Sequence, residues 1–445
     1  MSSNTAANIL FITLGCAKNE VDTDRMRALL LADGFSEVFS PEEADLAIVN
    51  TCSFLASATE ESVEATLEIA ESREAGVREC PIVMCGCVPS RYGDELRAEL
   101  PEVAAFVKAE DEDGICAVVR GALGLEASSG AAMDCGLLRT VEGASAFVKI
   151  SEGCDRFCTF CAIPYIRGRY HSRPQDEILA EVGALMEGGV REIILIGQDT
   201  GIWGSDFKDG SNLAGLLRAT AEVVRPYDGW LRVLYLQPEG MTDDLIAAIR
   251  DTPEVLPYID IPIQHCSSRI LKAMNRSGSP AELHELFARL RREIPGMVLR
   301  TTGMAGFPGE TDEEADELYD FIEAEEFDYT SVFAYSAEEG TRAAAMEGQV
   351  DEDVKLERTQ RLIDLVEELG FSATAKHVGE RVKVIIDGVE ETEEGLEFIG
   401  HTWFQAPDCD GAVHIASGEA CVGDIVTVDL VDSFCYEMIG EIVED

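Results

Sequence analysis

Three closely spaced cysteines constrain this chain more than any other feature. Cys154, Cys158 and Cys161 follow the spacing C-x3-C-x2-C within the segment 151–174. Thiolates at this density favour an iron–sulfur cluster or zinc. Structural zinc sites and electron-transfer clusters are normally closed by four protein ligands, so three ligands indicate a cubane with one open iron. The alternatives are a zinc knuckle that lacks its fourth ligand, or ordinary buried thiols.

A second group of cysteines follows predicted strands. Strands are predicted over 8–14, 45–50 and 81–84. Cys16, Cys52 and Cys87 come just after these strands and before helices predicted over 22–32, from 56, and over 92–100. Residues past the ends of parallel strands converge on one crevice, so a second three-thiolate site is predicted there. Cys85 competes with Cys87, but Cys87 follows a glycine, as Cys16 does; the alternative is three unrelated thiols.

The segment 105–143 has the composition of a linker. It is rich in Gly, Ala and Ser over 121–132, and a short helix is predicted before that stretch. Cys116 and Cys135 lie in this segment, and no ligand-like spacing relates either of them to another cysteine. We interpret both as plain thiols.

A new alternation of strands and helices begins at Ala144. Strands are predicted over 146–150, 192–196, 231–236, 258–263, 297–302 and 329–334, and helices over 175–187, 211–224, 242–250, 280–292 and 312–325. Six alternating units predict a partial (β/α) barrel whose site lies at the carboxyl ends of its strands. The triple-cysteine loop directly follows the first of these strands and therefore lies at that rim.

Basic residues gather in the cysteine loop of an otherwise acidic chain. They are Arg156, Arg167, Arg169 and Arg173. They could offset cluster charge or hold a substrate carboxylate, or they could simply pair with nearby acids.

Other rim candidates give weaker signals. His265 could be a ligand or an acid–base group, although a lone rim histidine is more often structural. The GFPGET stretch, 306–311, resembles a phosphate loop only weakly, and no G-x4-G-K-[ST] motif supports a nucleoside triphosphatase.

The C-terminal region changes to short strand patterns. After a long charged helix predicted over 351–376, strands are predicted over 381–387, 397–400, 412–415, 424–429 and 433–443. They indicate a small β-barrel. Its three basic residues, Lys376, Arg381 and Lys383, face seventeen acidic ones, whereas an oligonucleotide-binding barrel normally has a basic, aromatic face.

Charge and length limit the function classes. The 445 residues carry a formal net charge of −50, which should repel nucleic acid and anionic lipid and attract basic partners. General acidic adaptation of the host proteome is the alternative reason. No secretory signal and no apolar run of ~18 residues is present, so a cytoplasmic protein without membrane association is expected, with its fourteen cysteines reduced.

Four stretches resemble the methylthiotransferase family of radical S-adenosylmethionine (SAM) enzymes, RimO type. They are LGCAKNEVDTDRM from Leu14, SEGCDRFCTFCAIPYIRGRYHSRP from Ser151, GQDT from Gly197 and YIDIPIQHCSSRILKAMNR from Tyr258. The tRNA-modifying branch typically has GQNV instead of GQDT. This chain departs from the RimO pattern at Ala17, Cys85 and Ala305, none of which removes a ligand.

The resemblance implies three domains and one linker. The domains are an open parallel α/β sheet domain (1–125), a radical SAM barrel (144–375) and an all-β TRAM barrel (376–445), and the linker covers 126–143. It implies two 4Fe–4S clusters: Cys16, Cys52 and Cys87 would hold the auxiliary one, and Cys154, Cys158 and Cys161 the one that binds SAM. Phe160 is the aromatic residue that the family places before the third cysteine. With Gln198, Gln264 and Arg300, it is our predicted contact for SAM.

The reaction implied is replacement of a hydrogen on the β-carbon of an aspartate in ribosomal protein uS12 by a methylthio group. SAM cleavage would supply the radical that takes the hydrogen, the auxiliary cluster the sulfur, and a second SAM the methyl group. The implied partners are this basic protein, free or within the ribosomal subunit, and an external electron donor and sulfur source. The alternatives are a tRNA adenosine methylthiotransferase, a non-catalytic iron–sulfur carrier and a zinc-dependent nucleic-acid-binding protein.

Overall fold

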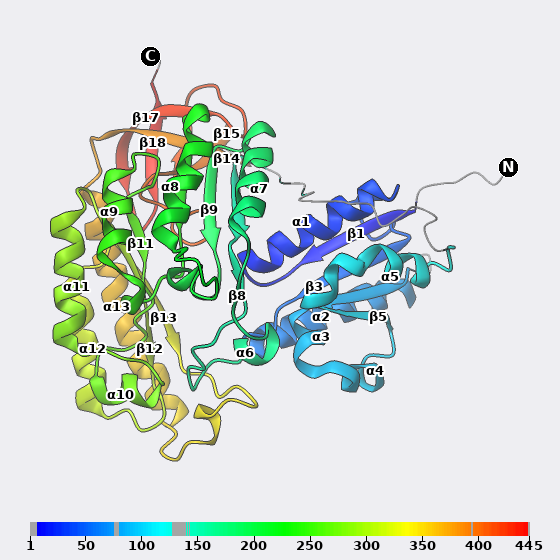
Figure 1. The fold of residues 1–445 in the computed structure, drawn as a ribbon, viewed down its shortest axis with the longest axis horizontal. Helices are drawn as coiled ribbons and strands as arrows, with labels where there is room; N and C mark the ends of the chain where they lie inside the picture. Colours follow the sequence, from blue (N-terminus) through cyan, green and yellow to red (C-terminus); the bar gives the residue numbers. More distant parts are fainter. Residues whose placement is uncertain are drawn as a thin grey trace. The chain divides into compact units, whose positions relative to one another are not determined.

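The structure is a computed structural model that describes residues 7–74, 80–126, 139, 141, 143–392 and 395–443. It divides into two compact units (Figure 1). The N-terminal unit comprises Met1–Val141, Glu152–Asp155 and Cys161–Tyr170. The C-terminal unit comprises Glu142–Ser151, Arg156–Phe160 and His171–Asp445. Cys135 lies outside the described residues.

The N-terminal unit is built on a five-stranded parallel sheet of order β2-β1-β3-β4-β5. Its strands are β1 (Asn8–Thr13), β2 (Ser36–Val38), β3 (Leu46–Thr51), β4 (Ile82–Gly86) and β5 (Val103–Lys108). Every residue of β3 and β4 is buried, because these strands lie inside the sheet and have helices on both faces. The predicted open parallel sheet is confirmed.

Helices cover both faces of this sheet. They are α1 (Ala17–Ala32), α2 (Ala56–Glu74), α3 (Cys87–Tyr92), α4 (Leu96–Glu99) and α5 (Ile115–Ala122). One core joins the sheet to α1 and α5, for example through Met26 and Ile115. The other joins it to α2, α3 and α4, for example through Ile69, Val88 and Leu96.

Three sequence predictions for this unit were wrong in detail. α1 begins at Ala17 rather than at residue 22, so its first turn directly follows Cys16. Two helices replace the one predicted over 92–100: α3 starts earlier, at Cys87, and ends at Tyr92, and α4 covers Leu96–Glu99. Pro89 lies in the first turn of α3, where proline is tolerated. The segment 105–143, whose composition suggested a linker, contains much of β5, which was not predicted; α5 corresponds to the short helix predicted there.

The C-terminal unit contains six parallel strands in two sheets, with orders β10-β9-β6 and β11-β12-β13. The strands are β6 (Ser145–Lys149), β9 (Glu192–Ile196), β10 (Trp230–Val233), β11 (Tyr258–Asp260), β12 (Val298–Ala305) and β13 (Tyr329–Ala334). The amide of Leu236, just past β10, donates to the carbonyl of Asp260 at 3.0 Å and joins the two sheets. The predicted partial (β/α) barrel is therefore confirmed.

Helices lie outside these strands (Figure 1). They are α7 (Gln175–Glu187), α8 (Leu213–Val224), α9 (Asp243–Asp251), α10 (Ser268–Ala273), α11 (Pro280–Glu293), α12 (Asp312–Glu325) and α13 (Glu352–Ala375). Side-chain caps start several of them: Ser279 accepts from Glu282 N at α11, and Thr311 forms a capping box with Glu314 at α12. These caps explain why the predicted starts of α11 and α12 were right. Short segments complete the chain: β7 (Ser151–Glu152), α6 (Ile163–Ile166) and β8 (His171–Ser172).

The chain ends in a closed five-stranded barrel of order β14-β15-β16-β18-β17. Its strands are β14 (Arg381–Thr392), β15 (Gly395–Thr402), β16 (Val413–Ile415), β17 (Ile425–Ser433) and β18 (Met438–Ile442). Closure leaves no sheet edge. This confirms the predicted all-β module.

Buried charges join this small barrel to the base of the larger one. Glu192 starts β9, and one carboxylate oxygen accepts from Arg232 Nε of β10 at 2.7 Å. Its other oxygen contacts His401 Nε2 of β15, and His401 Nδ1 contacts Asp387 at 2.6 Å. Glu192 and Arg232 have no exposed surface. Arg232 also donates to the carbonyls of Thr402 and Trp403.

This network predicts that stability falls as pH rises through about 9. Burial alone would lower the pKa of His401, but the carboxylates of Glu192 and Asp387 raise it from 6.5 to about 9. A group whose pKa is raised by folding stabilises fully below its unfolded pKa and loses that contribution above its folded pKa. We therefore expect the free energy of unfolding to decrease between pH 6.5 and about 9. Denaturant titrations across this range measure it.

The H401Q variant is the control, because it removes the titrating group. The difference in stability between wild type and H401Q should shrink as pH rises. A difference that stays constant from pH 6.5 to 10 would contradict the assignment.

No described helix combines the length and apolar character required for a membrane span.

Candidate iron–sulfur centres

Strand ends bring Cys16, Cys52 and Cys87 together in the N-terminal unit. Cys16 caps α1 just past β1, Cys52 directly follows β3, and Cys87 opens α3 directly after β4. The sulfur atoms of Cys16 and Cys87 lie 3.7 and 3.9 Å from the same side-chain oxygen of Asn19. Cys52 interacts electrostatically with both thiols. We call these three cysteines the auxiliary site.

Two glycines allow this close approach. Gly15 has φ +104°, and a Cβ there would lie 2.6 Å from the Cβ of Cys52. Gly86 has φ +89°, and its Cβ would lie 2.3 Å from the Asn50 side-chain oxygen. Any side chain at either position would be strained and would also collide with its neighbours.

Two asparagine side chains hold the surrounding backbone. Asn19 Nδ2 donates to the carbonyl of Thr51 at 2.7 Å. Asn50 Nδ2 donates to the carbonyl of Asn19 at 2.8 Å and to Thr23 Oγ1 at 3.0 Å. Both asparagines are fully buried. Sequence reasoning missed them, although a polar residue at the end of an apolar strand, as in Asn50, was an available signal.

The protein environment disfavours isolated thiolates at this site. Burial raises the pKa of Cys52 and raises that of Cys87 to about 11, while Arg167 acts to lower both. Metal ligation requires the deprotonated sulfur, so bound metal would supply the compensating positive charge. Cys16 is exposed, which leaves one side of the group open.

Cys85 points elsewhere. It has no exposed surface and packs in the core that contains Val107 and Ile115. Burial holds the pKa of its thiol well above the ordinary value. This placement favours Cys87 over Cys85 as the third ligand. Cys116 packs at the edge of the same core, as expected for a plain thiol.

The donor set suits a cubane better than a single ion. Across the described ranges, no three His, Cys, Asp or Glu side chains are placed to share one metal ion. A cubane spaces its ligands more widely, because each thiolate binds a different iron. Three converging thiols with one open side fit a cluster of that kind. The ligand assignment itself stays a prediction.

The cysteine loop belongs to both units. Cys154 and Cys161 lie in the N-terminal unit, where the Cys154 amide donates to the carbonyl of Gly168 at 3.2 Å. Cys158 lies in the C-terminal unit. Burial raises its pKa, and the nearby Arg276 and Arg156 act to lower it.

The backbone around Cys158 is firmly held. Phe157 has φ +48°, and its carbonyl accepts from Asn275 Nδ2 at 3.3 Å and from Arg342 at 3.2 Å. The Thr159 amide donates to the carbonyl of Met274 at 3.0 Å. The loop after α10 therefore fixes the position from which Cys158 projects.

Ion pairing accounts for the basic cluster of the cysteine loop. Arg156 pairs with Asp199 and Glu239, Arg167 with Asp22, Arg169 with Asp155, and Arg173 with Glu181. The Arg169–Asp155 pair is exposed, whereas Arg167 and Asp22 are almost fully buried. Arg167 also acts on the thiols of Cys52 and Cys87 in the auxiliary site.

The four predicted SAM contacts lie in different surroundings. Phe160 packs beside the core of Met274 and Phe307, and Gln198 lies two residues past the end of β9. Gln264 follows β11 with φ +67°, and its amide donates to the carbonyl of Thr302 at 2.8 Å.

Arg300 differs from the other three. It lies near the start of β12, and its guanidinium contacts Asp260 and Asp410 at 3.2 Å each and Ser331 at 2.8 Å. These partners favour a structural role for Arg300.

The remaining rim candidates are structural. His265 is fully buried, accepts from the Ser267 amide, and has a pKa lowered by burial to about 4. In the GFPGET loop the amides of Gly306 and Phe307 donate to Glu310, and that of Gly309 donates to the carbonyl of Gly348, so these donors are not available to a phosphate.

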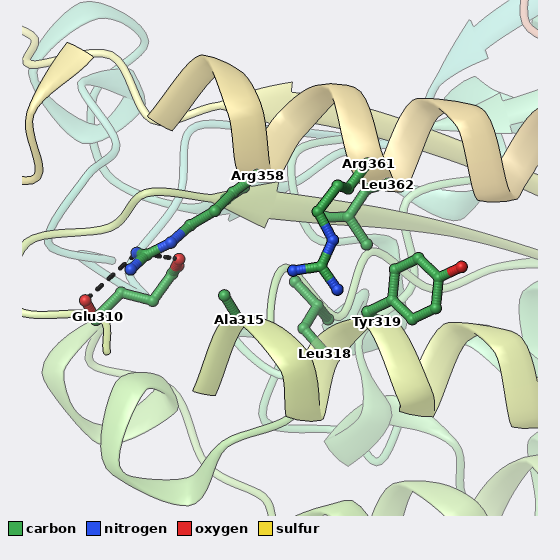
Figure 2. Close-up of a pocket in the computed structure, with 8 residues that line it drawn as sticks. Glu310, Ala315, Leu318, Tyr319, Arg358, Arg361 and Leu362 are labelled. Carbon is green, nitrogen blue, oxygen red and sulfur yellow. Dashed lines mark hydrogen bonds and ion pairs between the residues drawn. The ribbon is translucent and has the colours of Figure 1, made fainter. Parts of the chain in front are cut away.

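Arg358 of α13 forms an ion pair with the Glu310 carboxylate, with a nitrogen–oxygen distance of 2.9 Å (Figure 2). The cavity beside this pair has a volume of about 10 Å³. That volume is too small for anything larger than one water molecule.

Comparisons with known proteins agree with this architecture. The radical SAM superfamily matches residues 148–322, an uncharacterised family designated UPF0004 matches 8–108, and the TRAM domain matches 378–443. The ribosomal protein uS12 methylthiotransferases RimO of Trichlorobacter lovleyi and Pelobacter propionicus are each 41% identical to this chain, over 100% of both chains. That of Geobacter sulfurreducens is 41% identical over 99% of this chain and 100% of its own.

The chain belongs to the RimO family of methylthiotransferases. The RimO resemblance seen in the sequence is therefore confirmed, as is the class of enzyme, a radical SAM transferase of sulfur-containing groups. The cofactors of this RimO-family protein are SAM and 4Fe–4S clusters. A non-catalytic iron–sulfur carrier and a zinc-dependent nucleic-acid-binding protein are thereby excluded.

Solved structures show a similar fold at low sequence identity. The radical SAM methyltransferase TsrM from Kitasatospora setae matches with a TM-score of 0.56 and 14% identity, over 74% of this chain and 73% of its own. The cobalamin-dependent SAM radical enzyme OxsB matches with a TM-score of 0.51 and 12% identity, over 81% of this chain and 56% of its own. At this identity the likeness extends to the fold alone.

Proposed function

We propose that this RimO-family protein adds a methylthio group to the β-carbon of an aspartate in ribosomal protein uS12. The observation that carries the proposal is full-length identity of 41% to enzymes named for that activity. The convergence of Cys16, Cys52 and Cys87 supports it, because sulfur transfer requires a second cluster site besides the one that binds SAM.

Six cysteines would hold the two clusters. Cys16, Cys52 and Cys87 are the proposed ligands of one, and Cys154, Cys158 and Cys161 of the other. No side-chain base could remove an unactivated β-hydrogen as a proton at neutral pH. Clusters and SAM supply the one-electron chemistry that this C–H bond requires.

The chain's own residues would position the reactants and exclude water. Arg156 and Arg276 place positive charge beside Cys158, and Asn275 and Arg342 hold the loop that carries it. Phe160, Gln198 and Gln264 remain our proposed contacts for SAM, with Arg300 the least favoured because three polar partners already bind it.

The charge of the chain favours a basic protein over tRNA as substrate. The net charge is −50, and the C-terminal β-barrel is strongly acidic. Ribosomal proteins bind RNA and are correspondingly basic, so an acidic enzyme would attract them and repel free tRNA.

We further infer a cytoplasmic protein that depends on separate donors. Six cluster thiols need a compartment that keeps cysteines reduced. The matched domains account for the sheet, the larger barrel and the TRAM barrel, and none of them is an electron-transfer domain. Electrons and sulfur would therefore come from other molecules.

The substrate is tested by incubating anaerobically reconstituted protein with SAM, reductant and a sulfide source. One reaction receives ribosomal subunits containing uS12 and a parallel one receives bulk tRNA. We expect mass spectrometry to find the methylthio group on one aspartate of uS12 and no modified nucleoside in tRNA. Modification of tRNA adenosine with unmodified uS12 would instead establish the tRNA methylthiotransferase.

A further inference from the structure

Arg167 lies six residues after Cys161, yet its side chain is buried among the residues of the auxiliary site. Its side chain is only 3% exposed. One guanidinium nitrogen, Nη1, contacts Asp22 at 2.7 Å, and the other, Nη2, donates to the Asn19 side-chain oxygen at 2.9 Å. Glu152 is a more distant partner of Nη1, at 3.7 Å. All four residues belong to the N-terminal unit.

The oxygen of Asn19 that Arg167 contacts is the same one that lies near two thiols. It is 3.7 Å from the Cys16 sulfur and 3.9 Å from the Cys87 sulfur. Arg167 also acts electrostatically on the thiols of Cys87 and Cys52. A fixed positive charge therefore lies among the three thiols.

Burial of this guanidinium needs a reason, because a buried charge is costly unless it is paired and hydrogen-bonded. Asp22, itself 4% exposed, balances the charge. The guanidinium has five N–H donors in a rigid fork. Bonds to Asp22 and Asn19 occupy two of its nitrogens and orient the guanidinium beside the oxygen that lies near the Cys16 and Cys87 sulfurs. An aliphatic side chain would fill this space, but it would offer the sulfurs neither charge nor donor.

We propose that Arg167 is a positioning residue for the auxiliary cluster, holding Asn19 beside the Cys16 and Cys87 thiols and stabilising the negative charge of the cluster. This rests on the proposed function, which places a cluster on Cys16, Cys52 and Cys87. Hydrogen bonds to cluster sulfurs and nearby charge set both the retention of iron and the reduction potential. The loop that supplies Cys154 and Cys161 to one cluster thereby supplies the supporting charge of the other.

The test uses the full chain with Cys154, Cys158 and Cys161 replaced by alanine, so that bound iron reports on the auxiliary site alone. R167Q is introduced into this background. We expect about 10- to 100-fold weaker retention of iron against a chelator, the usual effect of removing a supporting contact. We also expect a more negative reduction potential, because a positive charge stabilises the reduced, more negative cluster. Iron analysis and anaerobic redox titration measure both.

R169Q is the matched control, since Arg169 lies in the same loop with a side chain that is 72% exposed. R167K keeps the charge but not the fork, so it should restore the potential more than the retention of iron. R167Q alone leaves the Asp22 carboxylate buried without its partner, which could unfold the protein. The R167Q/D22N double variant removes both buried charges and avoids this cost, and it should retain iron as weakly as R167Q.

A potential in R167Q equal to that in R169Q, with equal iron retention in R167Q, R167Q/D22N and R169Q, would overturn the role of Arg167 while leaving the proposed function intact. A background protein that binds no iron would instead overturn the auxiliary site, and the role of Arg167 with it.

Discussion

Replacing Cys16, Cys52 and Cys87 together with alanine should lower the iron content from about eight to about four irons per chain, if each site holds one four-iron cubane. Transfer of the methylthio group should be abolished, because no second site would remain for sulfur. Cleavage of SAM should persist, since Cys154, Cys158 and Cys161 are untouched. Iron and sulfide analysis of anaerobic protein measures the first effect, and chromatography of the reaction products the others.

Two controls sharpen this experiment. Alanine at Cys154, Cys158 and Cys161 should also leave about four irons but should abolish SAM cleavage. C85A should keep all the iron, because that thiol lies in the apolar core with Val107 and Ile115. Loss of iron in C85A comparable to that in C87A would show that Cys85 is a ligand.

Replacing Arg232 with methionine should destabilise the C-terminal unit by about 3–5 kcal/mol, the usual cost of removing one partner of a buried ion pair. Arg232 and Glu192 have no exposed surface. The variant would leave the buried Glu192 carboxylate with His401 as its remaining positively charged partner. Bonds from Arg232 to the carbonyls of Thr402 and Trp403 would also be lost. Denaturant-induced unfolding measures the change.

R381M provides the comparison at an exposed site. Arg381 contacts Asp429 at 2.6 Å, but these side chains are 61% and 43% exposed. Solvent screens such a pair, so its loss should cost about 0–1 kcal/mol. Equal destabilisation by R232M and R381M would show that burial of the Glu192 network contributes nothing. A second test is the R232M/E192L variant, which should recover much of the loss because no unpaired charge remains.

Local patterns were sufficient for most of the secondary structure. The predicted strands over 192–196 and 329–334 match β9 and β13, and the predicted helices over 175–187 and 312–325 match α7 and α12. These segments combine a strong apolar period with clear start signals.

The elements that were missed lack those signals. β2 and β5 are the edge strands of the first sheet, and both are partly exposed, so their apolar alternation is weak. The start of α1 was placed too late because its first turns are polar. Asn19 and Asp22 are nevertheless buried, because Asn19 lies beside the thiols of the auxiliary site and Asp22 pairs with Arg167.

The sequence by itself determined the chemistry of this protein. The spacing of Cys154, Cys158 and Cys161, together with the three cysteines that follow strands, was enough to predict two thiolate sites, and the resemblance of four longer stretches indicated the family. Spacing along the chain and the side-chain period of strands are local properties, so they can be read without coordinates.

Only the tertiary structure decided which side chains meet. It placed Cys85 in the core and Cys87 beside Asn19, and it brought Arg167 to Asp22 across 145 residues of chain. Its buried charges, Glu192 with His401, join segments 209 residues apart. Such contacts depend on how the whole chain packs, and no local pattern of residues specifies them.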